Sequence, residues 1–81
     1  MNQLERIYRI HDIFRTARRP VPMKRFTQEM ECTRNTITRD FAFMRDYLHA
    51  PIEYLKEANG LPHVRVGLMA GMIYGSALLN G

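Results

Sequence analysis

The fold is decided by residues 33–44, which read TRNTITRDFAFM. At about 100° per residue, a helix through this stretch places its bulky apolar side chains along one stripe. That stripe, which should face a core, consists of Ile37, Phe41, Met44 and Leu48. The opposite side is polar and partly cationic, and it consists of Asn35, Arg39, Ala42 and Asp46, with Thr36 and Thr38 at its edges. A helix over about residues 33–48 should therefore pack with one face and contact a partner with the other.

A second, shorter helix is expected directly before this one. Met23, Phe26 and Met30 recur at helical spacing and should form its buried side. Thr33 is suited to cap the following helix, because its hydroxyl can accept a hydrogen bond from a free backbone N–H. Two helices joined by a turn of three or four residues, with a polar face on the second, are typical of a DNA-binding helix-turn-helix.

Residues 3–17 predict another helix, which would cover the back of this pair. Its apolar stripe is expected to contain Leu4, Ile7, Tyr8, His11 and Phe14, widened by Ile10 and Ile13. The charged residues of the same helix are expected outside, and they are Glu5, Arg6, Arg9, Asp12 and Arg15. Prolines end this helix and begin the next, because proline removes a backbone donor. Val21, which lies between Pro20 and Pro22, should enter the core, and Pro22 should begin the second helix.

After the long helix, Pro51 prevents further helix, and two short alternating stretches follow at residues 52–56 and 63–66. Asn59 and Gly60 lie between them and tolerate the positive φ angles of a tight turn. A two-stranded ribbon is therefore expected.

Residues 21–26 and 33–41 together resemble the winged helix-turn-helix of WYL-domain transcriptional regulators and, more distantly, of DeoR-type repressors. The shared run is a capping Ser or Thr, Arg, a variable residue, Thr-Ile, a variable residue, Arg-Asp and an aliphatic residue; Phe41 stands at the last position here. Residues 4–8 and 50–54 also resemble the first helix and the wing entrance of that family. The resemblance covers about residues 3–66. It implies an α+β, mainly α fold, a three-helix winged helix-turn-helix with a two-stranded wing, forming a DNA-binding domain at residues 1–66.

Three positions acquire specific expectations from this resemblance. Glu31 stands where the family has a glycine in left-handed conformation, which a glutamate adopts at a cost of roughly 1 kcal/mol. Cys32 matches a small aliphatic position and is expected to be a buried plug. Asp40 should orient a neighbouring arginine or a backbone group, because an acid facing DNA would be repelled.

The charge distribution also favours nucleic acid. The chain has 81 residues and a net charge of +4. Residues 15–39 hold seven basic and two acidic residues, a net +5, whereas the other residues hold five basic and six acidic, a net −1. A cationic region around the predicted helix-turn-helix is expected of a phosphate-binding surface, with an ordinary solvated basic face as the alternative.

The expected DNA contacts come from the helix-turn-helix and the wing. Asn35, Thr38 and Arg39 are assigned to bases and Arg34 and Thr36 to phosphates, since arginine and asparagine can pair with base edges. Contacts to the backbone or the minor groove are also expected from Lys24, Arg25, Thr33, Lys56 and Arg65. For the two wing residues an ordinary exposed charge is an equally good interpretation.

Residues 67–81 carry no charge and are mostly apolar. They are expected to be either a helix or strand that pairs with a second copy or the end of a truncated or frame-shifted chain. A homodimer on repeated half-sites is expected. The resemblance implies a small-molecule effector only through a sensing domain that this sequence does not contain.

Other function classes find little in the sequence. The single cysteine allows no internal disulfide and lies in no metal-ligand pattern, the three histidines are scattered, and no cofactor loop is present, so no enzyme, metal or cofactor is predicted. Neither a secretory signal nor an apolar run of about 20 residues occurs, which favours a cytoplasmic protein without membrane contact. The prediction is sequence-specific binding of double-stranded DNA and transcription regulation; the alternative is a protein-interaction module using the winged-helix surface or the apolar tail.

Overall fold

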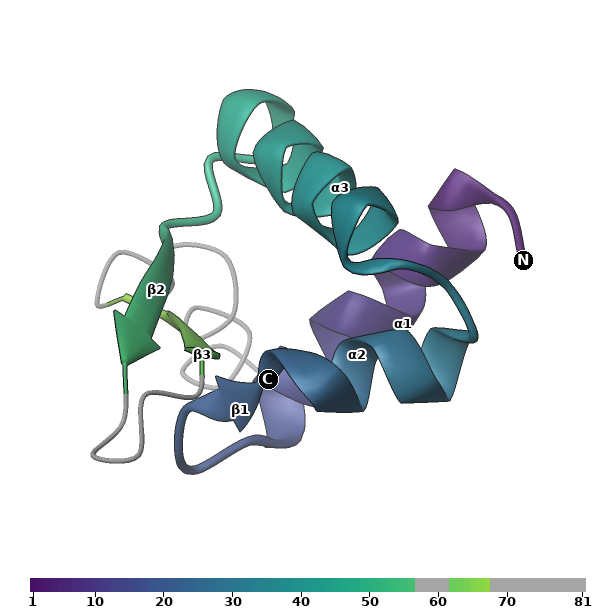
Figure 1. Ribbon diagram of the computed structural model, residues 1–81. Helices are drawn as coiled ribbons and strands as arrows, with labels where there is room; N and C mark the ends of the chain where they lie inside the picture. The colour runs from purple at the N-terminus through teal and green to yellow at the C-terminus, as the bar shows by residue number, and fades with distance from the viewer. Residues whose placement is uncertain (57–61, 68–81) are drawn as a thin grey trace.

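The computed structural model describes residues 1–56 and 62–67, which form an α+β, mainly helical structure (Figure 1). Figure 1 shows the helices grouped on one side and the strands on the other. The described helices are α1 (Gln3–Thr16), α2 (Met23–Met30) and α3 (Arg34–Tyr47), and the strands are β1 (Val21–Pro22), β2 (Ile52–Lys56) and β3 (Pro62–Val66). The expected class, α+β and mainly α, is confirmed. The predicted turn at residues 59–60 and the tail from residue 68 lie outside the described residues.

The sheet contains one strand more than the two expected. The ribbon formed by β2 and β3 is present, with Ile52 opposite Val66 and Lys56 opposite Pro62. β1 adds to the free side of β3 by pairing Val21 with Val64, so the order is β1-β3-β2 and all pairs are antiparallel. Sequence periodicity missed β1 because two residues are too short to show an alternation. Its Pro22 is tolerated because β1 is an edge strand.

The core is centred on three phenylalanines, one from each helix. Ring centroids of Phe14 and Phe26 are 5.4 Å apart, those of Phe26 and Phe41 are 5.2 Å apart, and those of Phe14 and Phe41 are 5.9 Å apart. Such pairs stabilise a core by about 0.5–1.5 kcal/mol beyond their buried area. The buried positions predicted for the second and third helices are confirmed except for Leu48, and they are Met23, Phe26, Met30, Ile37, Phe41 and Met44. The core also contains Ile10, Ile13, Val21, Ala50, Ile52 and Val64.

The predicted buried stripe of α1 was wrong in part. Leu4 and Tyr8 were expected in the core, yet they are 63% and 68% exposed, while Ile10, Ile13 and Phe14 are buried as expected. Apolar residues surround most of this helix, so its periodicity fits more than one stripe, and packing against α2 and α3 selects the one centred on Ile10. Leu48 was also expected in the core, but it is 44% exposed because α3 ends at Tyr47.

Residues 31–33 join α2 to α3 in the way that the sequence predicted. Glu31 is left-handed at φ 49° and ψ 48°, which ends α2, and the N–H of Cys32 donates back to the Thr27 carbonyl at 3.1 Å. Thr33 then caps α3 by accepting from the Thr36 N–H at 3.3 Å. Pro22 precedes α2 without any side-chain cap. The start of α3 is therefore fixed by its own cap and by the turn before it.

Candidate functional site

The exposed side of α3 carries four polar residues with no described partner. Arg34, Asn35, Thr38 and Arg39, here called the α3 polar face, are all exposed and lie within its first two turns. In the part of the chain that the structure describes, no carboxylate forms an ion pair with either arginine. Figure 1 shows α3 along the upper edge of the described structure, with α1 and α2 below it. These side chains are thus left open to solvent.

The N-terminus of α3 adds backbone donors to this face. The first N–H groups of a helix have no acceptor within it, and the helix dipole is positive at that end. The Thr36 N–H is taken by Thr33, whose hydroxyl also lies 3.2 Å from the Thr36 hydroxyl. The Arg34 and Asn35 N–H groups precede that capped position. The helix therefore begins with donors and a favourable dipole beside two exposed side chains, an arrangement suited to an anion.

Asp40 is turned inward from the same helix and is neutralised there. It is 1% exposed, and its two carboxylate oxygens accept from Arg6 Nε at 2.6 Å and Arg6 Nη2 at 3.2 Å. Gln3 Nε2 lies 3.4 Å from one of these oxygens, and a further Arg6 nitrogen donates to the Met1 carbonyl at 3.0 Å. The hydrogen bond to Asp40 raises the pKa of Arg6 more than burial lowers it. The carboxylate adjacent in sequence to Arg39 is thus buried and paired with an arginine.

The pair of Arg6 and Asp40 bears on two sequence predictions, one of which was wrong. Arg6 was expected on the outer side of α1, but it is half-buried because it pairs with Asp40. Asp40 was expected to orient an arginine, and the arginine is on another helix, 34 residues earlier in the chain. The pair therefore connects the middle of α3 to the first half of α1.

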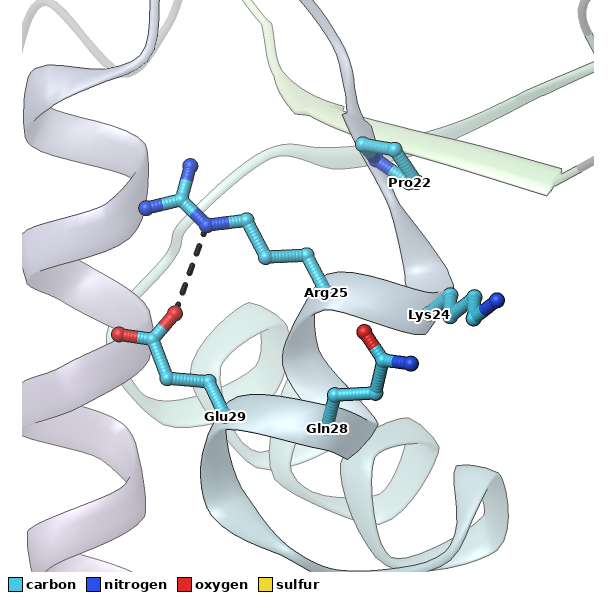
Figure 2. A pocket seen from close by; sticks show the side chains of 5 residues that line it. All are labelled: Pro22, Lys24, Arg25, Gln28 and Glu29. Atoms are coloured by element: carbon cyan, nitrogen blue, oxygen red, sulfur yellow. Dashed lines mark hydrogen bonds and ion pairs between the residues drawn. The ribbon is translucent and has the colours of Figure 1, made fainter.

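The predicted contacts on α2 are both exposed but differ in their partners. A surface hollow of about 430 Å³ is lined by Pro22, Lys24, Arg25, Gln28 and Glu29. Figure 2 shows how these five side chains lie. Arg25 points toward α1 and its Nε lies 3.4 Å from Glu29, which also contacts Arg9 of α1 at 3.5 Å. Lys24 points the other way and has no partner among the described residues. Lys24 is the freer of the two cations.

The predicted contacts on the sheet differ in the same respect. Arg65 on β3 is held by Glu53 on β2, with Nε and Nη2 at 3.0 Å and 2.9 Å from the same carboxylate oxygen. Both side chains are about half exposed. Lys56 is exposed at the end of β2 and forms no described ion pair. A phosphate near Arg65 would have to share it with Glu53.

The basic segment at residues 15–39 does not form one surface. Arg18 and Arg19 follow α1 in the connection to β1, which lies in the lower part of Figure 1, whereas α3 forms its upper edge. The sequence analysis assigned these charges to the surroundings of the predicted helix-turn-helix because the residues are close to it in the sequence. The fold instead separates them from the α3 polar face.

Sequence reasoning also missed the aromatic side chains around the end of α3. The ring centroids of Phe43 and Tyr47 are 4.8 Å apart, and Tyr47 is 71% exposed. The Arg45 guanidinium lies over the Tyr54 ring of β2 at 5.5 Å from its centroid. Contacts between a helix and a later strand leave no local sequence signal, whereas the spacing of Phe43 and Tyr47 by four residues could have predicted their pairing.

Cys32 is half-buried against the core, and burial raises the pKa of its thiol, which disfavours the reactive thiolate.

Residues 1–56 and 62–67 contain no group of three or more side chains placed to hold a metal ion. None of the helices described is long and apolar enough to cross a membrane.

Comparison of the chain with protein-family models, with curated proteins and with solved structures finds no significant match in any of the three. A function must therefore be inferred from the residues themselves and from their geometry.

Proposed function

We propose that the protein binds double-stranded DNA through the α3 polar face, as the winged helix-turn-helix of a cytoplasmic transcriptional regulator. The observation that carries this proposal is the exposure of Arg34, Asn35, Thr38 and Arg39 on a helix whose opposite side is packed in the core. A packed helix presents these side chains in a fixed orientation. Base recognition requires such an orientation, because a bidentate contact depends on its geometry.

The dimensions of α3 suit the major groove. Fourteen residues give a helix about 21 Å long, and a groove about 12 Å wide admits one. In this arrangement Asn35, Thr38 and Arg39 face base edges. Arg34 and the free N–H groups at the helix start hold a phosphate. The buried Asp40 adds no repulsion on this side, since Arg6 neutralises it.

Other elements supply contacts to the DNA backbone. The three-residue connection between α2 and α3 is the length that a helix-turn-helix requires, and Lys24 on α2 is free to meet a phosphate. The ribbon of β2 and β3 corresponds to a wing, from which Lys56 can reach the backbone directly. Two copies would read two half-sites one helical turn apart.

Selection of bound duplexes from a random pool at near-physiological salt tests the proposal, and half-site spacing in the selected sequences reports the subunit arrangement. Arg39→Ala should relax the selected sequence, because Arg39 is assigned to a base, whereas Arg34→Ala should weaken binding to all duplexes alike. Loss of the phosphate contact should also reduce the slope of log affinity against log salt by about 0.9. Arg15→Ala, an exposed arginine on α1, is the matched control. Equal losses in all three variants would contradict the assignment.

A second candidate is a protein-interaction module. It is favoured by exposed apolar side chains on two elements, Leu4 and Tyr8 on α1 and Tyr47 and Leu48 at the end of α3. An interface of this kind is stabilised by apolar burial and changes little with ionic strength, whereas DNA binding weakens steeply as salt displaces it. Binding measured over a range of salt concentrations separates the two candidates.

A further inference from the structure

A second hollow, separate from the α3 polar face, lies between the end of α1 and β3. Its volume is about 220 Å³. The described residues that line it are Phe14, Ala17, Arg18, Arg19, Pro20, Val64, Arg65 and Val66. We call it the arginine hollow. It combines an apolar floor with three cationic side chains and, among the described lining residues, no acidic one.

The cationic side of the hollow is not fully neutralised. Arg18 and Arg19 are exposed, and neither forms an ion pair within the described part of the chain. Arg65 is paired with Glu53, which holds its guanidinium in one orientation. Two unpaired guanidinium groups from consecutive residues attract an anion, and arginine can donate two hydrogen bonds to one carboxylate or phosphate.

The apolar floor of the arginine hollow could contact the uncharged part of such an anion. Ala17, Pro20 and Val66 are half-buried and supply accessible apolar surface, while Phe14 and Val64 are buried beneath them. A hollow of 220 Å³ is smaller than the roughly 300–1,000 Å³ typical of sites for larger ligands. It has room for a single ring or a short aliphatic chain.

We propose that the arginine hollow binds a small organic anion, with its apolar body on the floor and its phosphate or carboxylate between Arg18 and Arg19. The family resemblance implies an effector site in a separate domain, whereas this hollow lies within the described residues. The proposal does not depend on DNA binding, because the connection carrying both arginines lies away from α3 (Figure 1).

Titration of the full chain with phenyl phosphate, followed by amide NMR shifts, tests the proposal. Saturable shifts are expected at Ala17, Arg18 and Val66. Inorganic phosphate tests the anionic group alone and benzyl alcohol the ring alone, and each should bind at least about tenfold more weakly, since each lacks one part of the site. Inorganic phosphate binding as tightly as phenyl phosphate would overturn the proposal, because the floor would then contribute nothing.

Matched charge variants separate this site from general attraction of anions. Arg18→Ser combined with Arg19→Ser should weaken phenyl phosphate binding by about tenfold or more, because it removes charged donors. Arg34→Ser combined with Arg39→Ser makes the same change of charge on α3 and should leave unaltered the phenyl phosphate affinity measured from the shifts at Ala17, Arg18 and Val66. Equal losses in the two double variants would overturn the proposal.

Two further measurements complete the test. Ala17→Leu fills the floor without changing charge and should also weaken phenyl phosphate, and the amide spectrum of each variant reports whether it is folded. Duplex DNA affinity is measured on the same proteins, so that failure of DNA binding and failure of this site are distinguishable. If the Arg18 and Arg19 double variant loses duplex affinity but keeps phenyl phosphate affinity, the proposal is overturned and both arginines belong to a DNA surface.

Discussion

The pairing of Arg6 with Asp40 predicts a large and specific loss of stability. We expect Arg6→Met to lower the free energy of unfolding by about 3 kcal/mol, because removing one member of a buried pair leaves the other charge without compensation. Asp40 is 1% exposed and the Arg6 side chain 17% exposed, so water reaches this pair poorly. The partial exposure of Arg6 places the loss at the lower end of the range for buried pairs.

The size of the domain makes this loss easy to detect. A chain of this length has a total unfolding free energy of about 5 kcal/mol, so Arg6→Met should remove more than half of it. Urea unfolding followed by circular dichroism measures the change, with an unaltered slope as the sign that the denatured state is the same. Arg15→Met is the matched control: Arg15 also pairs with an aspartate on α1, but both side chains are about half exposed. It should leave the midpoint unchanged.

A double variant distinguishes a pairing effect from loss of packing. Arg6→Met combined with Asp40→Leu removes both charges and keeps the volume apolar, and it should recover most of the stability that Arg6→Met loses. If Arg6→Met destabilises no more than Arg15→Met, the pair does not stabilise the fold. If the double variant loses the sum of the single effects, the residues are not coupled, and the reasoning from their 2.6 Å contact is wrong.

Three single residues outside this pair should also change the stability of the fold. Glu31→Gly should raise the free energy of unfolding by about 1 kcal/mol, because Glu31 is left-handed and glycine adopts this conformation without a steric cost. Gln28→Gly, inside α2, should lower the free energy of unfolding by about the same amount. A urea series in which both variants are destabilised would refute this prediction. Thr33→Ala should lower it by about 1 kcal/mol through loss of the α3 cap, and Thr33→Ser should restore most of it; equal melting temperatures for the alanine and serine variants would show that the cap contributes nothing. Burial lowers the pKa of His11, so the unfolded chain binds a proton at this residue more readily than the folded one. The free energy of unfolding should therefore fall as the pH drops below about 6.5. If a His11→Gln variant shows the same decline, the pH dependence comes from other groups.

The sequence predicted α3 well because one set of its bulky apolar residues recurs at helical spacing. Ile37, Phe41 and Met44 are four and three residues apart, and the residues between Ile37 and Phe41 are all polar, so the stripe through these three side chains is clear. The cap at Thr33 was equally visible, since it depends on the residue type next to the helix, whereas the left-handed turn at Glu31 was expected only because the resemblance implies one there. The α3 polar face follows from the same stripe, and all four of its residues are exposed as expected.

The features that the sequence did not predict depend on contacts between parts of the chain that are far apart in the sequence. Arg6 and Asp40 are 34 residues apart, and nothing near either one predicts the other. The stripe of α1 was ambiguous because Leu4 and the ring of Tyr8 offer apolar surface as Ile10 does, and only tertiary packing decides which side is buried. Arg18 and Arg19 follow α1 directly, yet the connection to β1 carries them away from α3 (Figure 1).

The charges along α3 restrict how it would enter a groove. Arg34 and Arg39 are exposed in its first two turns, and the intervening sequence adds no exposed acid. Asp46, by contrast, is exposed near the end of the helix on the same side as Arg39, where it would repel a phosphate. Arg45 does not offset this charge fully, because it lies over the Tyr54 ring of β2. The first half of α3 is thus the cationic half, and it also carries the N–H groups and the positive end of the dipole, so it is the half that should approach the DNA.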